Sequence, residues 1–109
     1  MVQPPIIVIE STADVRICPT LARAGQALEA TDVKEGVYRA FDSAGTPLEL
    51  AVTSWIRVEV REVPGASPRP DELAGMLRGL LRARGYIEAD DMTLSLDALA
   101  QLCSAFALG

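Results

Sequence analysis

The clearest pattern of hydrophobic and polar positions lies in the middle of the chain. A β-branched and aromatic run over residues 37–41 is followed by turn residues and a second apolar run over residues 48–52. Residues 54–63 then alternate between apolar and charged side chains. The apolar positions of that alternation are Ile56, Val58 and Val60. Because successive side chains of a strand point to opposite faces, the pattern predicts three antiparallel strands with one apolar and one charged face.

The N-terminal part of the chain predicts a hairpin followed by a helix. Two short β-branched runs, residues 6–10 and 15–18, are separated by turn residues and predict the hairpin. Thr20 is the expected N-cap of a helix of small residues that ends near Ala30. Residues 31–36 are polar and are expected to form a connection into the central strands.

The C-terminal third predicts two helices. Residues 64–70 are rich in proline and glycine and predict a crossover from sheet to helix, with Ser67 as a candidate cap and Gly85 as the stop signal. Thr93 or Ser95 is expected to cap the last helix. The buried stripe of the first of these helices is Leu73, Met76, Leu77, Leu80 and Leu81. The buried stripe of the second is Leu96, Leu99, Leu102, Cys103 and Phe106.

Together these elements predict an α+β fold in the order β-β-α-β-β-β-α-α. The 109 residues suffice for one hydrophobic core, so residues 1–109 are expected to form a single domain. The expected architecture is a mainly antiparallel sheet covered on one face by helices.

The amino-acid composition indicates in which cellular compartment the protein is expected. Half of the residues are apolar, which argues against disorder, and no apolar run approaches the roughly 20 residues of a membrane span. The first residues, MVQPP, lack the basic and apolar regions of a signal peptide. Cys18 and Cys103 are the only cysteines and are expected to be reduced and buried. These features indicate a cytoplasmic protein that does not associate with membranes.

Charge indicates a protein partner rather than a nucleic acid. The formal net charge is −5, whereas nucleic-acid binders present a basic face to the phosphates. After residue 86 the chain carries four acidic residues and no basic residue. An acidic surface of this kind favours association with a basic partner.

The residues needed for common catalytic, cofactor and metal sites are missing from the sequence. There is no histidine, the cysteines number two, and the single lysine does not follow a phosphate-binding loop. The cluster Glu88, Asp90 and Asp91 lacks the spacing of a calcium loop. We therefore expect no catalytic residues, no bound cofactor and no metal site, and a protein that is not an enzyme.

Candidate partner-binding residues occur on the charged strand face and near the acidic end. Trp55 is either a cover for the sheet or an exposed aromatic anchor, and the charged residues of both regions either face solvent or contact a partner. The candidates are Glu49, Trp55, Glu59, Glu88, Asp90 and Asp91.

Residues 32–52 carry a motif of the form Asp-Val-x-x-Gly-x-Tyr, followed by an aromatic-Asp-x-x-Gly-x-x-Leu hairpin. The residues concerned are Asp32, Val33, Gly36, Tyr38, Phe41, Asp42, Gly45 and Leu48. This segment resembles small bacterial immunity proteins encoded beside the polymorphic toxins of contact-dependent inhibition, Rhs and type VI secretion systems. The resemblance implies an inhibitor that binds and neutralises a cognate toxin domain.

Two alternatives belong to other classes. The chain is also compatible with a small structural or regulatory adaptor that forms a homodimer by pairing exposed strand edges. An enzyme or small-ligand carrier would require a large pocket beneath the helices.

Overall fold

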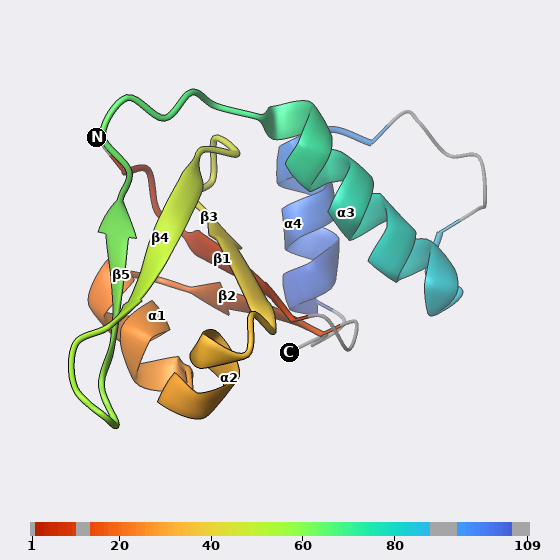
Figure 1. Cartoon of the computed structure of the whole chain (residues 1–109). Helices are drawn as coiled ribbons and strands as arrows, with labels where there is room; N and C mark the ends of the chain where they lie inside the picture. The colour runs from red at the N-terminus through yellow and green to blue at the C-terminus, as the bar shows by residue number, and fades with distance from the viewer. Residues whose placement is uncertain (1, 11–13, 88–93, 106–109) are drawn as a thin grey trace.

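The computed structural model describes residues 2–10, 14–87 and 94–105. In this part of the chain, five antiparallel strands form one sheet in the order β2-β1-β3-β4-β5. The strands are β1 (Ile6–Glu10), β2 (Val15–Cys18), β3 (Tyr38–Phe41), β4 (Pro47–Val52) and β5 (Val58–Glu62). The helices are α1 (Leu21–Ala27), α2 (Ala30–Lys34), α3 (Pro70–Ala83) and α4 (Leu96–Ala105). The α+β class is confirmed (Figure 1).

The predicted N-terminal hairpin and the three predicted central strands are both present, and one strand pairing joins them into a single sheet. β1 and β2 form the N-terminal hairpin, with Ile7 opposite Ile17, and β3, β4 and β5 pair in sequence. The joining pair is β1 with β3, in which Val8 lies opposite Ala40. The strand order therefore brings the first strand to the centre of the sheet.

The structure contains one helix more than predicted, the first helix ends earlier, at Ala27, and the last strand begins later. Residues predicted as a polar connection contain α2, because Ala30 and Val33 lie one turn apart and pack against the core. The last strand begins at Val58 and not at Ser54. The amide of Thr53 donates to the carbonyl of Arg57 at 3.0 Å, so the intervening residues form the turn of a hairpin.

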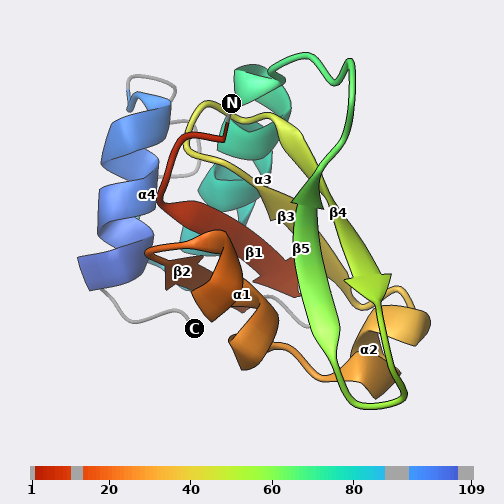
Figure 2. The same ribbon diagram turned by 90° about the vertical axis from the view of Figure 1, so that its left-hand side faces the viewer.

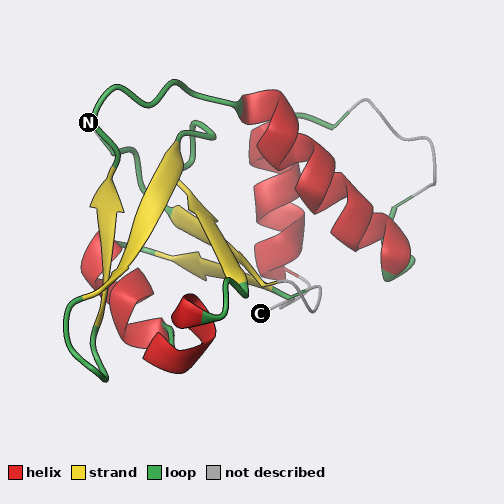
Figure 3. Cartoon of the chain, viewed as in Figure 1, coloured by secondary structure: helices red, strands yellow, loops and turns green. Residues whose placement is uncertain are grey.

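Helices cover both faces of the sheet, whereas the sequence pattern predicted cover on one face. α1 and α2 pack on one face, and α3 and α4 pack on the other (Figures 2 and 3). The core under α1 and α2 includes Ile6, Val8, Tyr38, Val58 and Val60. The core under α3 and α4 includes Ile7, Ile9, Phe41, Leu77 and Leu99. The predicted one-sided cover holds only for β4 and β5, whose second face is not covered by any helix in the described part of the chain.

Helix α1 lies close to the edge strand β5 at one glycine. A Cβ atom at Gly25 would stand 2.7 Å from the carbonyl oxygen of Val58, which is closer than such atoms approach. Gly25 therefore permits the contact between α1 and β5, although glycine costs helix stability of up to about 1 kcal/mol relative to alanine. The helix shields this end of the β5 edge.

The ends of the C-terminal helices agree in part with the predicted caps. Arg69 is the N-cap residue of α3 and makes no side-chain cap, so Ser67 does not cap this helix. Gly85 follows α3 with a φ of 75°, as its predicted role as a stop requires. Ser95 caps α4, since its Oγ accepts from the amide of Ala98 at 3.2 Å. Thr93, the other candidate, and Phe106 of the predicted stripe lie outside the described residues.

Candidate functional site: the bare face of β4 and β5

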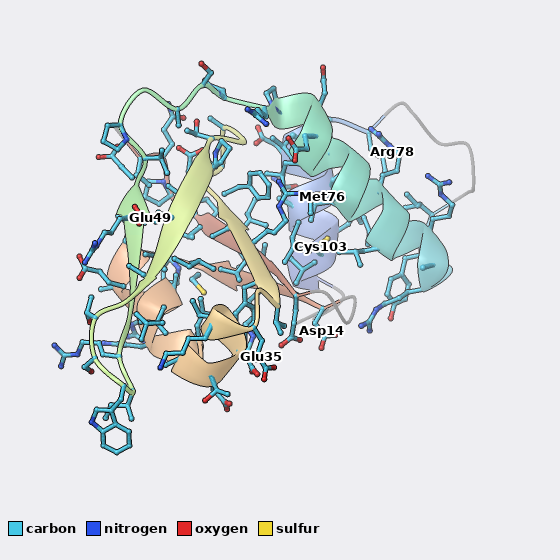
Figure 4. All side chains as sticks on the ribbon, viewed as in Figure 1. Asp14, Glu35, Glu49, Met76, Arg78 and Cys103 are labelled. Carbon is cyan, nitrogen blue, oxygen red and sulfur yellow. The ribbon has the colours of Figure 1, made fainter. Side chains whose placement is uncertain are left out.

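Among the residues that the structure describes, β4 and β5 form the part of the sheet that has no helix over one of its faces. Its exposed surface, which we call the bare face, consists of Glu49 and Ala51 on β4 and Glu59 and Arg61 on β5. The register places Glu49 opposite Arg61 and Ala51 opposite Glu59. In Figure 4, Glu49 lies over these strands, well away from Met76 and Cys103 beside α3 and α4. The predicted charged strand face is present here.

The bare face carries charges of both signs. Arg61 contacts the carboxylate of Glu59 with two nitrogens, Nε at 3.1 Å and an Nη atom at 3.3 Å. The hydrogen bond from Arg61 lowers the pKa of Glu59, and the same bond raises the pKa of Arg61. Glu49 forms no salt bridge with any residue that the structure describes. The face therefore has no single sign of charge with which to select a basic partner.

The hairpin between β4 and β5 projects two large apolar side chains. Trp55 is 82% exposed and Ile56 is 68% exposed. They lie in the turn closed by Thr53 and Arg57, and we call residues 54–57 the hairpin tip. Trp55 therefore does not pack under a helix. The prediction that Ile56 shares the buried face of Val58 and Val60 is wrong, because Ile56 precedes the strand.

Glu72 of α3 forms ion pairs with two arginines. Arg39 of β3 contacts Glu72 of α3 at 2.5 Å, and Arg69 contacts the same carboxylate at 3.6 Å. The hydrogen bond from Arg39 is the main cause of a lowered pKa at Glu72. The guanidinium of Arg39 also lies 5.3 Å from the centroid of the Phe41 ring. Arg39 therefore connects the sheet to α3.

The structure brings together only some of the candidate contact residues. Glu49 and Glu59 lie on the bare face, and Trp55 lies at the adjoining hairpin tip. The other three candidates, Glu88, Asp90 and Asp91, lie outside the described residues. Ile56 and Arg57 were not among the candidates. The polar pair Thr53-Ser54 before Trp55 is the sequence signal for a turn that would have placed them at the tip.

The two thiols are buried and weakly reactive. Burial raises the pKa of Cys18 and raises the pKa of Cys103 to about 11. Both side chains therefore stay protonated at neutral pH, and a protonated thiol is a poor nucleophile and metal ligand. Within residues 2–10, 14–87 and 94–105, no three histidine, cysteine or acidic side chains lie close enough together to hold a metal ion.

A groove lies at the opposite end of β4 from the hairpin tip. It has a volume of about 450 Å³ and runs between the N-terminal segment, the β3–β4 turn and the crossover after β5. Asp42 lines it but is 2% exposed, and its carboxylate accepts from the amides of Gln3, Ala44 and Thr46. Those three bonds give Asp42 a structural role in holding the turn and the N-terminal segment.

Comparison of the chain with protein-family models, with curated protein sequences and with solved structures found no match in any of the three. None of the helices in the described residues has the length and hydrophobicity needed to cross a membrane.

Proposed function

We propose that this chain is a non-catalytic protein-binding domain whose contact surface is the hairpin tip together with the bare face. The observation that carries this proposal is the exposure of adjacent Trp55 and Ile56 at the end of a β-hairpin. Large apolar side chains at this level of exposure are costly in water, and tryptophan is enriched among the residues that dominate binding energy.

The geometry of the hairpin suits such a role. The bond from the Thr53 amide to the Arg57 carbonyl, at 3.0 Å, and the bond from the Arg57 amide to the Ser54 carbonyl, at 3.4 Å, hold the tip. A backbone held before binding reduces the conformational entropy lost on association. The charged side chains of the bare face would form a polar rim around the apolar anchor, as in many protein interfaces.

We further propose that the domain is an immunity protein that binds and neutralises a cognate bacterial toxin domain in the cytoplasm. Support comes from the resemblance of residues 32–52 to immunity proteins, and stoichiometric inhibition needs only a stable binding surface. The net charge of −5 would speed association with a basic toxin domain. Because the bare face carries charges of both signs, we assign this electrostatic attraction of a basic partner to Glu88, Asp90 and Asp91.

Affinity purification from native lysate tests the protein-binding proposal. We expect the wild-type chain to retain the C-terminal fragment of a large secreted protein at near one-to-one stoichiometry. The variant Trp55→Ser/Ile56→Ser should lose that fragment, because the anchor is gone. Arg82→Ser is the matched control, since Arg82 is exposed on α3, outside the proposed surface. Equal recovery by both variants would contradict binding through the hairpin tip.

Co-expression separates the immunity role from protein binding in general. The recovered fragment should arrest growth when produced alone, and the wild-type chain should restore growth. Trp55→Ser/Ile56→Ser should fail to restore growth, and Arg82→Ser should succeed. Recovery of a non-toxic partner would contradict the immunity role while leaving the binding role intact. Recovery of the chain itself alone would favour the homodimeric adaptor.

A further inference from the structure

A second apolar surface feature lies on the same molecule as the hairpin tip. It is a crevice of about 250 Å³ between the first two strands and α4. The cross-strand pair Ile7 and Ile17 lines it, together with Pro5 and with Ala100 of α4. Asp97, in the first turn of α4, also lines the crevice and is exposed. The crevice is therefore apolar inside and carries a carboxylate at its margin.

The hairpin tip has the complementary chemistry. Trp55 and Ile56 are apolar and project into solvent, and the next residue, Arg57, is exposed. Among the residues that the structure describes, neither Arg57 nor Asp97 takes part in a salt bridge. An apolar anchor beside a cation therefore matches an apolar crevice beside an anion.

The two features lie at opposite ends of the sheet. β4 runs from the β3–β4 turn to the hairpin tip, and Ser43 of that turn lines the crevice. Pro5 lies at the same end, because β1 begins where β3 ends, with Ile7 opposite Phe41. The tip therefore cannot reach the crevice of its own molecule. A second copy, displaced along the direction of β4, presents its crevice to the tip.

We propose that the chain associates with itself head to tail, with Trp55 and Ile56 of one copy in the crevice of the next and Arg57 paired with Asp97. Such a contact is heterologous, so each added copy leaves one free tip and one free crevice. Because the contact consists of one apolar anchor and one ion pair, we expect the association to be weak and dependent on concentration. If the proposed function holds, self-association and partner binding compete for the same tip.

Sedimentation velocity of the purified chain alone, from ~10 µM to ~1 mM, tests the contact without any partner. The mean sedimentation coefficient of the wild type should rise continuously with concentration. Trp55→Ser should weaken association about 30-fold, as loss of a dominant interface residue does. Ala100→Leu, which fills the crevice, should weaken association by at least about tenfold. Circular dichroism confirms that each variant is folded.

Charge exchange tests the pairing of the two ends. Arg57→Asp and Asp97→Arg should each weaken association about fivefold or more, and the double variant should return to within about twofold of the wild type. Arg82→Asp is the control, because it makes the same charge change as Arg57→Asp on α3 and should have no effect.

Three results would overturn the proposal. The first is a wild type that stays monomeric up to ~1 mM. The second is a dimer of fixed mass, which indicates a closed two-fold interface. The third is a double charge exchange that fails to restore association. Each of these results leaves partner binding through the tip to be decided by the purification and co-expression experiments.

Discussion

β1 and β5 are five-residue strands of the same sheet, but their surroundings differ completely. In β1 the four residues from Ile6 to Ile9 are all buried, because α1 lies over one face and α3 and α4 lie over the other. In β5 only Val58 and Val60 are buried, and Glu59 and Arg61 face solvent. A continuous apolar run thus marks the strand covered twice, and alternation marks the strand covered once.

The comparison divides the molecule into two regions with different roles. The region around β1, β2 and β3 has core on both faces of the sheet, whereas β4 and β5 contribute to the core on one face only. The region of β4 and β5 has a free face and an exposed tip, where side chains are available for contact. Substitutions should therefore affect stability in the first region and binding in the second.

The largest effect is expected from a cavity in the covered region. Leu77 of α3 is fully buried against the sheet, so Leu77→Ala should reduce the free energy of unfolding by about 2–5 kcal/mol. Glu59→Ala on the bare face should leave it nearly unchanged, because this side chain is exposed. Urea denaturation followed by circular dichroism measures both. Similar losses in the free energy of unfolding for the two variants would show that the two regions do not differ in their contribution to stability.

The next effect concerns the junction between the regions. Gly45 has a φ of 85°, and a Cβ atom there would stand 2.7 Å from the Cα of Pro70 at the start of α3. Gly45→Ala should therefore cost at least about 1–3 kcal/mol, through backbone strain and through the clash. Gly65→Ala is the matched control, since Gly65 has a φ of 77° and an added Cβ atom would meet none of the described residues within 4 Å. In urea denaturation, equal costs for both variants would show that strain alone acts and that the packing of the turn on α3 contributes nothing.

A smaller effect of opposite sign is expected on the outer side of α3. Cβ atoms added at Gly75 and Gly79 would meet no atom of the described residues within 4 Å, so these residues leave room for them. Gly75→Ala and Gly79→Ala should each raise the free energy of unfolding by about 0.5–1 kcal/mol, because alanine favours helix. Thermal unfolding measures the gain. If binding of the partner is also lost in these variants, α3 and not the bare face is the contact surface.

The smallest effect is expected from the exposed ion pair on the bare face. The hydrogen bond from Arg61 lowers the pKa of Glu59 in the folded state. The pair therefore stabilises the fold above the ordinary pKa of a glutamate, and this contribution is lost as the pH falls through the lowered value. Because both groups are exposed, the effect on stability should be slight.

Nuclear magnetic resonance titration of the Glu59 carboxyl carbon measures this pKa directly. Arg61→Ala should raise the titration midpoint of Glu59 towards the ordinary value for glutamate. The midpoint of Glu72 should stay where it is, because Arg39 is the main cause of its lowered pKa. An unchanged midpoint at Glu59 would mean that the pair does not persist in solution.

Local sequence signals were sufficient for most of the elements. β1 and β2 have the predicted bounds, and Thr20 caps α1 by accepting from the amide of Arg23 at 3.1 Å. These features depend on residues that are close together in the chain, so they can be predicted from the local sequence. The pairing of β1 with β3 has no such signal, because it joins residues far apart in the chain.

The sequence predicts the part of the candidate surface that lies on strand β5, but it does not predict the hairpin tip. The alternation of Val58, Glu59, Val60 and Arg61 is a local property, so the charged face could be inferred. Ile56 continues the same alternation by coincidence, and only the hydrogen bonds that close the turn place it in solvent. The contact of Arg39 with Glu72 depends on where α3 crosses the sheet, which no local pattern encodes.

The pairing of β1 with β3 also has a consequence for the rate of folding. Each hairpin can form by itself, since its strands are close in the chain, but β1 must meet β3 across a segment that contains β2, α1 and α2. Closing that long segment costs chain entropy before the contacts between the hairpins are made. The meeting of the two hairpins is therefore the step expected to limit how fast this chain folds.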